Sequence, residues 1–234
     1  MTRVLVFEVW GEYGHFRKHY TTTSPLTFSI PSRTALTGLI GAIIGLPKEE
    51  YLGYFRRKRA QIGVRLMAPV KKVRFSENLI DTKKAGPMMN EIKNRTQIQY
   101  ELLKDPRFRV YFAHEDPDIQ ETARDLLSTH RSVYTPCLGL SEHIANFMYI
   151  GEYEAEKKRS EAVEIHTAVR SDEVGSIIFE PGLQYISEIM PVEMADDRTV
   201  TDYSEIIFER NGNPIRAENT LYWELEDGEH ITFL

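Results

Sequence analysis

The sequence predicts an α+β fold with two domains, and three patterns carry this prediction. Short β-branched and aromatic runs alternate with two segments of helical periodicity over residues 1–155. A long polar segment interrupts this alternation at about 73–107. From residue 156 to residue 234 only short apolar runs separated by Pro-Gly, Asn-Gly and Asp-Gly turn signals follow. We therefore expect a first domain over 1–155 and a smaller β-rich domain over 156–234.

The first domain follows the order strand, helix, strand, insertion, strand, helix, strand. Residues 3–10 (RVLVFEVW) predict the first strand, and 61–73, 107–113 and 145–153 predict the other three. This is the order of a ferredoxin-like βαββαβ domain. The insertion at 73–107 is interpreted as a hairpin thumb, because a structureless loop of that length is unusual in a compact domain.

The first helix carries start and stop signals together with three glycines. Ser32 or Thr34 can cap its N-terminus, and apolar residues follow at helical spacing until Gly45 ends it. Gly38 and Gly41 lie inside the helix, where each glycine costs about 1 kcal/mol relative to alanine. We interpret them as a face that another backbone or an RNA chain approaches closely. Gly38, one turn past the helix start, is the glycine expected near a bound phosphate.

Two further helices are expected, a short one at 48–58 and a longer one from Pro117 to about residue 130. Asp116 can cap the longer helix directly ahead of that proline. His114, Asp116 and Asp118 alternate as metal ligands can, but capping explains Asp116 better and the sequence offers no second ligand cluster. We therefore predict no metal and no cofactor.

Composition is that of a soluble globular protein, with 41% hydrophobic and 27% charged residues. Cys137 is the single cysteine, which excludes an internal disulfide. The longest aliphatic run, Gly38–Leu46, is far shorter than the roughly 20 residues that span a bilayer. Glu8 and Glu12 interrupt the N-terminal stretch where a secretory signal would be apolar. We expect a cytoplasmic protein without a membrane partner.

Charge is divided unequally along the chain. Residues 1–110 carry 20 Lys and Arg against 9 Asp and Glu, a net charge of +11. Residues 111–234 carry 9 against 26, a net charge of −17. Such a division suggests one pole that meets polyanions. The densest basic run, Tyr54–Arg74, has eight basic and no acidic residues, although a solvated charged surface is its plainer interpretation.

The loop between the first strand and the first helix is the strongest candidate site. Phosphate oxygens accept hydrogen bonds from hydroxyls, cationic side chains and the unpaired N–H groups of a helix N-terminus. Phe16 and Tyr20 offer rings on which bases of single-stranded RNA can stack. An ordinary polar loop is the alternative, and we favour RNA binding. The polar and cationic candidates are Arg17, Lys18, Thr21, Thr22, Thr23, Ser32, Arg33 and Thr34.

Two enzymatic alternatives remain open at this point. Lys18, His19 and Tyr20 are residue types that can cleave RNA without metal by activating its 2′-hydroxyl, but nothing in the sequence orients them. A small-molecule enzyme on the same fold would need a closed apolar pocket with perturbed carboxylates, and no spacing in the acidic half singles out such a pair.

Three segments together resemble the Cas-five family of CRISPR-associated RAMP proteins. They are the N-terminal strand ending in glycine, SPLTFSIPSRTALTGLIGAIIGL (24–46) and YTPCLGLSEHIANF (134–147). The helix and the YxPxLGLSE pattern look most like the type I-B branch. The resemblance extends to about Tyr153 and fits the C-terminal half only loosely.

This resemblance implies a non-catalytic subunit of a type I Cascade surveillance complex in antiviral defence. Such subunits bind and cap the 5′ handle of crRNA, contact the backbone subunits and the large PAM-reading subunit, and meet target DNA only through the complex. By position, the resemblance implies RNA contacts from Arg17, Lys18, Tyr20, Thr21, Thr22, Thr23, Ser32, Arg33 and Thr37, from the thumb residues Asn90, Lys93 and Arg95, and from Tyr134, Leu138 and Gly139.

One branch of the family, type I-C, cuts precursor crRNA with a tyrosine, a lysine and a histidine, the last two lying well downstream of the tyrosine. Here the only adjacent lysine and histidine are Lys18 and His19, directly beside Tyr20. We therefore predict no catalytic residues, with a metal-independent endoribonuclease built on these three as the alternative. The acidic segments Glu152–Glu164 and Asp196–Glu209 are expected to face solvent or a basic neighbour, away from RNA.

Overall fold

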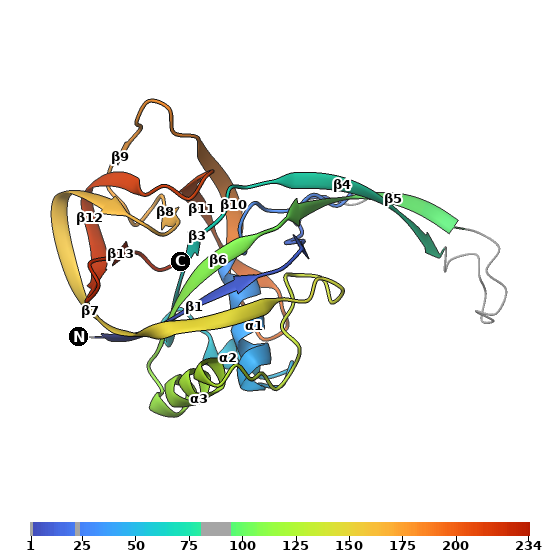
Figure 1. Cartoon of the computed structure of the whole chain (residues 1–234), viewed down its shortest axis with the longest axis horizontal. Coiled ribbons are helices and arrows are strands. Elements are labelled where there is room, and N and C mark those ends of the chain that lie inside the picture. The colour runs from blue at the N-terminus through green and yellow to red at the C-terminus, as the bar shows by residue number, and fades with distance from the viewer. Residues whose placement is uncertain (1, 22–23, 81–94) are drawn as a thin grey trace.

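A computed structural model describes residues 2–21, 24–80 and 95–234 of the chain. The described part contains three antiparallel sheets and three helices (Figure 1). The mixed α/β composition predicted from the sequence is confirmed. No helix in this part of the chain combines the length and apolar character needed to cross a membrane.

The largest sheet has seven strands in the order β13-β12-β7-β1-β6-β3, with β9 added beside β12. Its bounds are β1 Thr2–Trp10, β3 Ala60–Leu66, β6 Arg107–His114, β7 Asn146–Ile165, β9 Ile177–Ile178, β12 Ile215–Leu225 and β13 His230–Ile231. Helix α1 (Arg33–Ile44) follows β1 along the chain, and α3 (Pro117–Ser128) follows β6.

Strand β1 lies at the centre of this sheet and is buried on both faces. Phe7 packs into the main core with Ile40 of α1 and Leu127 of α3. Val6 points the other way, into a second cluster with Leu225. This explains why residues 3–10 read as a nearly continuous apolar run rather than an alternating one.

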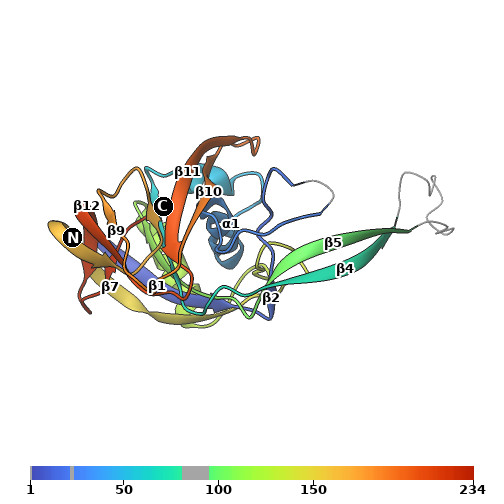
Figure 2. The same ribbon diagram turned by 90° about the horizontal axis from the view of Figure 1, so that it is seen from above.

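The predicted thumb insertion is a long hairpin made by β4 (Lys72–Ile80) and β5 (Arg95–Lys104). Figure 2 shows it projecting away from the rest of the molecule. At its base β5 also pairs with the two-residue strand β2 (Tyr13–Gly14). Most of its residues are exposed on both faces, so the hairpin presents side chains to its surroundings rather than to the core.

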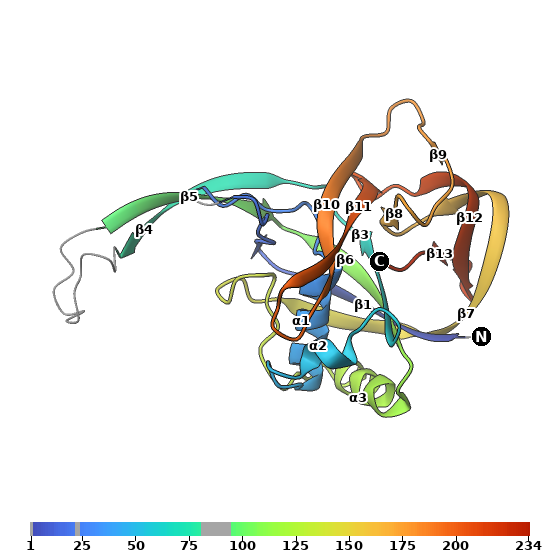
Figure 3. The same cartoon turned by 180° about the vertical axis from the view of Figure 1, so that it is seen from behind.

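The third sheet is formed by β10 (Tyr185–Met194), β11 (Val200–Glu209) and the short β8 (Val169–Arg170). Figure 3 shows the β10–β11 hairpin lying across α1 with its turn next to α2. Met190 and Phe208 belong to the same core cluster as α1. The predicted boundary at residues 155 and 156 lies inside β7, and the division into two domains stays a prediction.

Three predicted elements differ in length from those observed. The helix expected at 48–58 is the single turn α2 (Tyr51–Tyr54), after which Phe55 enters the core. The strand expected at 61–73 ends at Leu66, shortly before Pro69. The strand expected at 145–153 continues to Ile165, because beyond Ala155 it pairs with β12 instead of β1.

Candidate nucleic-acid interface

Arg33 begins α1 but does not face solvent. Its side chain is only 2% exposed, and its guanidinium donates to the carbonyl oxygens of Phe55 (2.9 Å), Ala60 (2.7 Å) and Val192 (3.1 Å). Burial lowers the pKa of Arg33 to about 10. The predicted phosphate contact is therefore corrected: this side chain fastens α1 to the start of β3 and to β10, and we leave it out of the interface.

Three more predicted contacts, Ser32, Thr37 and Leu138, are buried, and a fourth, Gly139, is exposed but packs its backbone on the first loop. Ser32 caps α1 by accepting from the amide of Ala35 (3.2 Å), and Thr37 donates to a carbonyl within the same helix. Leu138 is fully buried, and its carbonyl accepts from the amide of His15 (2.9 Å). Gly139, at φ 94°, lies directly against the same stretch. The amide of Tyr134 also donates to the carbonyl of Ala42 (2.9 Å), so the two sequence motifs pack on each other, and the second motif supports the start of the first loop.

The first loop is fixed at Lys18 and exposed around it. The Lys18 ammonium lies 2.8 Å from the Glu188 carboxylate of β10. Burial lowers the pKa of Lys18, but the hydrogen bond and charge of Glu188 outweigh it, and the pKa is raised. Arg17 and Tyr20 are exposed, and Arg17 donates to the carbonyl of Thr21 (3.0 Å). Arg17 is therefore the cation of this loop that remains available to a ligand.

The loop and the β4–β5 hairpin form one continuous surface. Lys72 at the base of the hairpin donates to the carbonyl of Thr27 (2.8 Å), and the amide of Glu101 donates to the carbonyl of Pro25 (3.0 Å). Arg95 is exposed at the start of β5. The predicted contacts Thr22, Thr23, Asn90 and Lys93 lie outside the described residues.

Large apolar side chains are exposed on the β4–β5 hairpin. Phe75, Leu79 and Ile80 of β4 are all among the exposed large hydrophobic residues. No sheet or helix of the described residues covers these side chains, and apolar side chains exposed together on a projecting hairpin are typical of a contact surface.

A groove along α1 brings two other predicted residues together. Gly38 of the helix and the exposed Tyr134 both line a cavity of about 570 Å³. Arg198, from the β10–β11 turn, places its guanidinium 5.9 Å from the ring centre of Tyr51. Sequence reasoning missed Tyr51, which follows the first motif by five residues, and Arg198, which is far from either motif in the sequence. The full lining is Gly38, Gly41, Ala42, Leu46, Pro47, Lys48, Glu49, Tyr51, Tyr134 and Arg198.

We expect Gly38→Ala to raise the free energy of unfolding by about 0.5–1 kcal/mol. A β-carbon at this helical position would come no closer than 4.0 Å to Tyr51, so the helix propensity of alanine is gained without a clash. Gly45→Ala is the contrasting variant, because Gly45 has φ 83° and its β-carbon would lie 2.7 Å from Val133. Urea denaturation of both variants checks this; a destabilising Gly38→Ala would contradict the open groove.

The basic run Tyr54–Arg74 is largely paired within the molecule. Arg56 lies 2.6 Å from Asp196 and Arg57 lies 2.8 Å from Glu173, and Arg65 contacts Glu229. The opposite charges of the two halves of the chain thus partly neutralise each other across the fold. The inference of a single basic pole is corrected accordingly.

The central sheet contains a similar buried arrangement. Glu8 of β1 is almost completely buried and accepts from Arg107 (2.7 Å) and Arg109 (2.9 Å) of the neighbouring strand. Burial raises the pKa of Glu8, but the two guanidinium groups lower it further than burial raises it. These two arginines are therefore held by an internal carboxylate.

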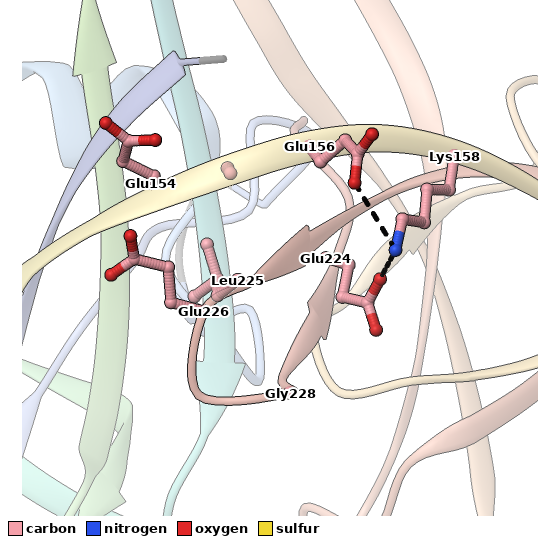
Figure 4. A pocket seen from close by; sticks show the side chains of 8 residues that line it. Glu154, Glu156, Lys158, Glu224, Leu225, Glu226 and Gly228 are labelled. Carbon is pink, nitrogen blue, oxygen red and sulfur yellow. Dashed lines mark hydrogen bonds and ion pairs between the residues drawn. The ribbon is translucent and has the colours of Figure 1, made fainter.

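An acidic pocket of about 330 Å³ lies between β7 and the end of β12 (Figure 4). Glu154, Glu156, Glu224 and Glu226 line it together with Lys158, whose ammonium contacts Glu224 and lies 3.4 Å from Glu156. The negative electrostatic potential of this pocket is unsuited to binding phosphate. Within residues 2–21, 24–80 and 95–234, no three or more His, Cys, Asp or Glu side chains come together in a way that could hold a metal ion. Asp116 caps α3 as predicted.

Comparison with known families connects this geometry to a class of proteins. The family described as CRISPR-associated protein (Cas_Cas5) matches residues 4–212. The chain belongs to this family. The resemblance read from the motifs is confirmed, and it extends well past Tyr153 into the C-terminal half. The type I-B assignment stays a prediction. A search of curated protein sequences found no match.

Solved structures related to this Cas_Cas5 family member share its fold at low sequence identity. A CRISPR protein from Archaeoglobus fulgidus has a TM-score of 0.59 at 12% identity, covering 98% of this chain and 97% of its own. A chain of a CRISPR RNA-guided surveillance complex has a TM-score of 0.54 at 15% identity, covering 90% and 91%. A chain of a type III-B Cmr-beta complex bound to cognate target RNA has a TM-score of 0.53 at 12% identity, covering 92% and 86%.

Proposed function

We propose that this Cas_Cas5 family member is a non-catalytic subunit of a type I Cascade complex, of the type I-B branch, that binds the 5′ handle of crRNA. The observation that carries the proposal is the continuous surface formed by the exposed loop at Arg17–Thr21 and the base of the projecting β4–β5 hairpin. This surface offers an available guanidinium and aromatic rings, so it suits a flexible polyanion with exposed bases.

The proposal assigns different roles to the predicted residues. Arg17, Tyr20, Thr21 and Arg95 contact RNA directly, as do Thr22, Thr23, Asn90 and Lys93. Gly38 and Tyr134 line a second part of the interface along α1. Lys18, Ser32, Thr37, Leu138 and Gly139 hold the loop and helix in position.

We assign the fold to the ferredoxin-like class, on the strand order β7-β1-β6-β3 and the positions of α1 and α3 in the chain. The exposed apolar side chains of β4 are assigned to contacts with backbone subunits, and the large PAM-reading subunit and target DNA are met within the same cytoplasmic complex. A solved relative of the same fold is described as part of an RNA-guided surveillance complex, which supports this kind of partner.

The protein is expected to bind an RNA carrying the repeat-derived 5′ end of its host's crRNA more tightly than a random RNA of equal length. Arg17→Ala should weaken this binding about tenfold and lower the slope of log K against log salt concentration by about 1, since one phosphate contact is lost. Arg159→Ala, an exposed arginine on the acidic part of β7, is the matched control and should change neither quantity. Equal affinity for the two RNAs would refute handle recognition.

A metal-independent endoribonuclease is the second candidate, because Lys18, His19 and Tyr20 are consecutive and the Tyr20 ring packs edge to face against His19, with ring centres 5.2 Å apart. Incubating the protein with precursor crRNA in EDTA decides between the two. A defined product that is lost on His19→Ala and on Tyr20→Phe would establish cleavage. We expect the RNA to be bound and recovered intact.

A further inference from the structure

We propose that Tyr203 of β11 forms, with His19 and Tyr20, an aromatic platform on which one base of the bound RNA stacks. The inference rests on the proposed RNA-binding function and extends the interface to the acidic C-terminal half. The ring centres of His19 and Tyr203 lie 4.9 Å apart with the rings tilted by 49°, and those of His19 and Tyr20 lie 5.2 Å apart at 87°. The rings are not coplanar, so the base stacks on the face of the Tyr203 ring and meets the other two rings at its edge. Residues about 180 positions apart in the sequence thus form one cluster.

Tyr203 is an anomaly on its strand. The outward face of β11 is otherwise polar around it, with Thr201 and Glu205 two residues to either side. Tyr203 is nevertheless 42% exposed, and Tyr20 beside it is 62% exposed. Large rings left in water at one place are typical of a surface that binds something.

The platform is held in place by buried contacts beneath it. Lys18 precedes His19 and forms its ion pair with Glu188, whose carboxylate also accepts from the amide of Ser29 (2.8 Å). Both side chains of the pair are largely buried. The loop is therefore fastened to β10, the strand that pairs with β11, so the rings are positioned before any ligand arrives. Lys18 acts here as a positioning residue.

A nucleobase fits this surface better than a protein side chain does. The Arg17 guanidinium donates to the carbonyl of Thr21, the residue after Tyr20 (3.0 Å), so a base on the rings would have its phosphate close to a guanidinium. The carboxylates of Asp202 and Glu205, which flank Tyr203 along β11, do not oppose this strongly, because Asp202 lies 3.4 Å from Arg57 and Glu205 accepts from Ser187. Aromatic rings beside a cation are the usual means of holding single-stranded RNA.

The decisive variant is Tyr203→Ala in the full-length protein, measured with the same repeat-derived RNA at fixed salt. Loss of one stacked base should raise Kd roughly tenfold. The salt slope should stay unchanged, because stacking neutralises no phosphate, in contrast to Arg17→Ala. Tyr203→Phe should bind as the wild type does. Phe179→Ala is the matched control, since Phe179 is an exposed aromatic that packs on Tyr185 instead of the loop.

A series of RNAs with one abasic nucleotide at each position of the 5′ end identifies the stacked base. The RNA that lacks the stacked base should bind wild type and Tyr203→Ala equally, because without that base the Tyr203 ring has nothing to stack on. If Tyr203→Ala binds every RNA as tightly as wild type does, the platform is refuted while the RNA-binding function stands. If wild type itself fails to prefer the repeat-derived RNA, the proposed function fails first.

Two further outcomes are also decisive. If Tyr203→Ala leaves RNA affinity intact but releases another subunit of the complex in pull-down, the surface is a protein contact and the inference is wrong. Should Tyr203→Ala fail to fold, Tyr20→Ala and His19→Ala decide in its place, and each must weaken RNA binding without altering the salt slope.

Discussion

Arg33→Ala is expected to lower the free energy of unfolding by about 3 kcal/mol or more. The substitution leaves three buried carbonyl oxygens without their donor, and each unsatisfied buried acceptor costs about 1–3 kcal/mol. It also opens a cavity at the junction of α1, β3 and β10. In a chain of this length such a loss corresponds to a fall in Tm of roughly 6–12 °C.

Two variants separate this role from RNA binding. Arg33→Met keeps much of the apolar volume and should be destabilised too, because the carbonyls remain unpaired. Arg17→Ala removes an exposed arginine from the same region and should change stability by less than about 0.5 kcal/mol while weakening RNA binding. Calorimetry and RNA titration of the three proteins check this. A stable Arg33→Ala that has lost RNA affinity would restore the phosphate contact inferred from sequence.

Arg33 also shows where the sequence stops being informative. A basic residue directly after a helix cap fits a phosphate site and a buried anchor equally well. Its three acceptors lie 22, 27 and 159 residues away in the chain, so no local pattern distinguishes the two. The same limit applies to the basic run at Tyr54–Arg74, whose acidic partners Glu173, Asp196 and Glu229 are all distant in sequence.

Features governed by neighbouring residues were predictable. Ser32 and Asp116 cap their helices, and Gly45 ends α1 with φ 83°, because capping depends on a few adjacent residues. The hairpin insertion was predictable because the polar segment at 73–107 is too long for a structureless loop in a compact domain. The apolar run of β1 predicted a buried strand. It did not predict that residues of β12 and β13 would cover the second face of that strand.

Tyr203 is a functional candidate that a local pattern could have revealed. The sequence VTDYSEIIFE places threonine, tyrosine and glutamate at alternating positions, and such residues share one face of a strand. A single aromatic on that polar face is the signal. The excess of acidic residues in the C-terminal half obscures this signal, because the net charge of a whole segment says nothing about a single ring on one face of a strand.

Gly139→Ala is expected to lower the free energy of unfolding by clearly more than the roughly 1–2 kcal/mol that a left-handed backbone conformation costs by itself. Gly139 has φ 94°, and a β-carbon there would lie 1.9 Å from the carbonyl oxygen of His15. The overlap is with backbone, so it is relieved only by moving the start of the first loop. That movement would break the hydrogen bond from the His15 amide to the Leu138 carbonyl (2.9 Å).

Gly182→Ala is the control that measures the free-energy cost of a left-handed backbone conformation without any steric overlap. Gly182 has φ 88°, but a β-carbon there would meet nothing within 4 Å. It should therefore lose only the roughly 1–2 kcal/mol of a left-handed residue, whereas Gly139→Ala should lose clearly more and also weaken RNA binding, because the loop that carries Arg17 begins at His15. Denaturant titrations compare the two. Equal losses of unfolding free energy would mean that moving the first loop away from the YTPCLGLSE segment costs no free energy. The supporting role assigned to this segment would then be wrong.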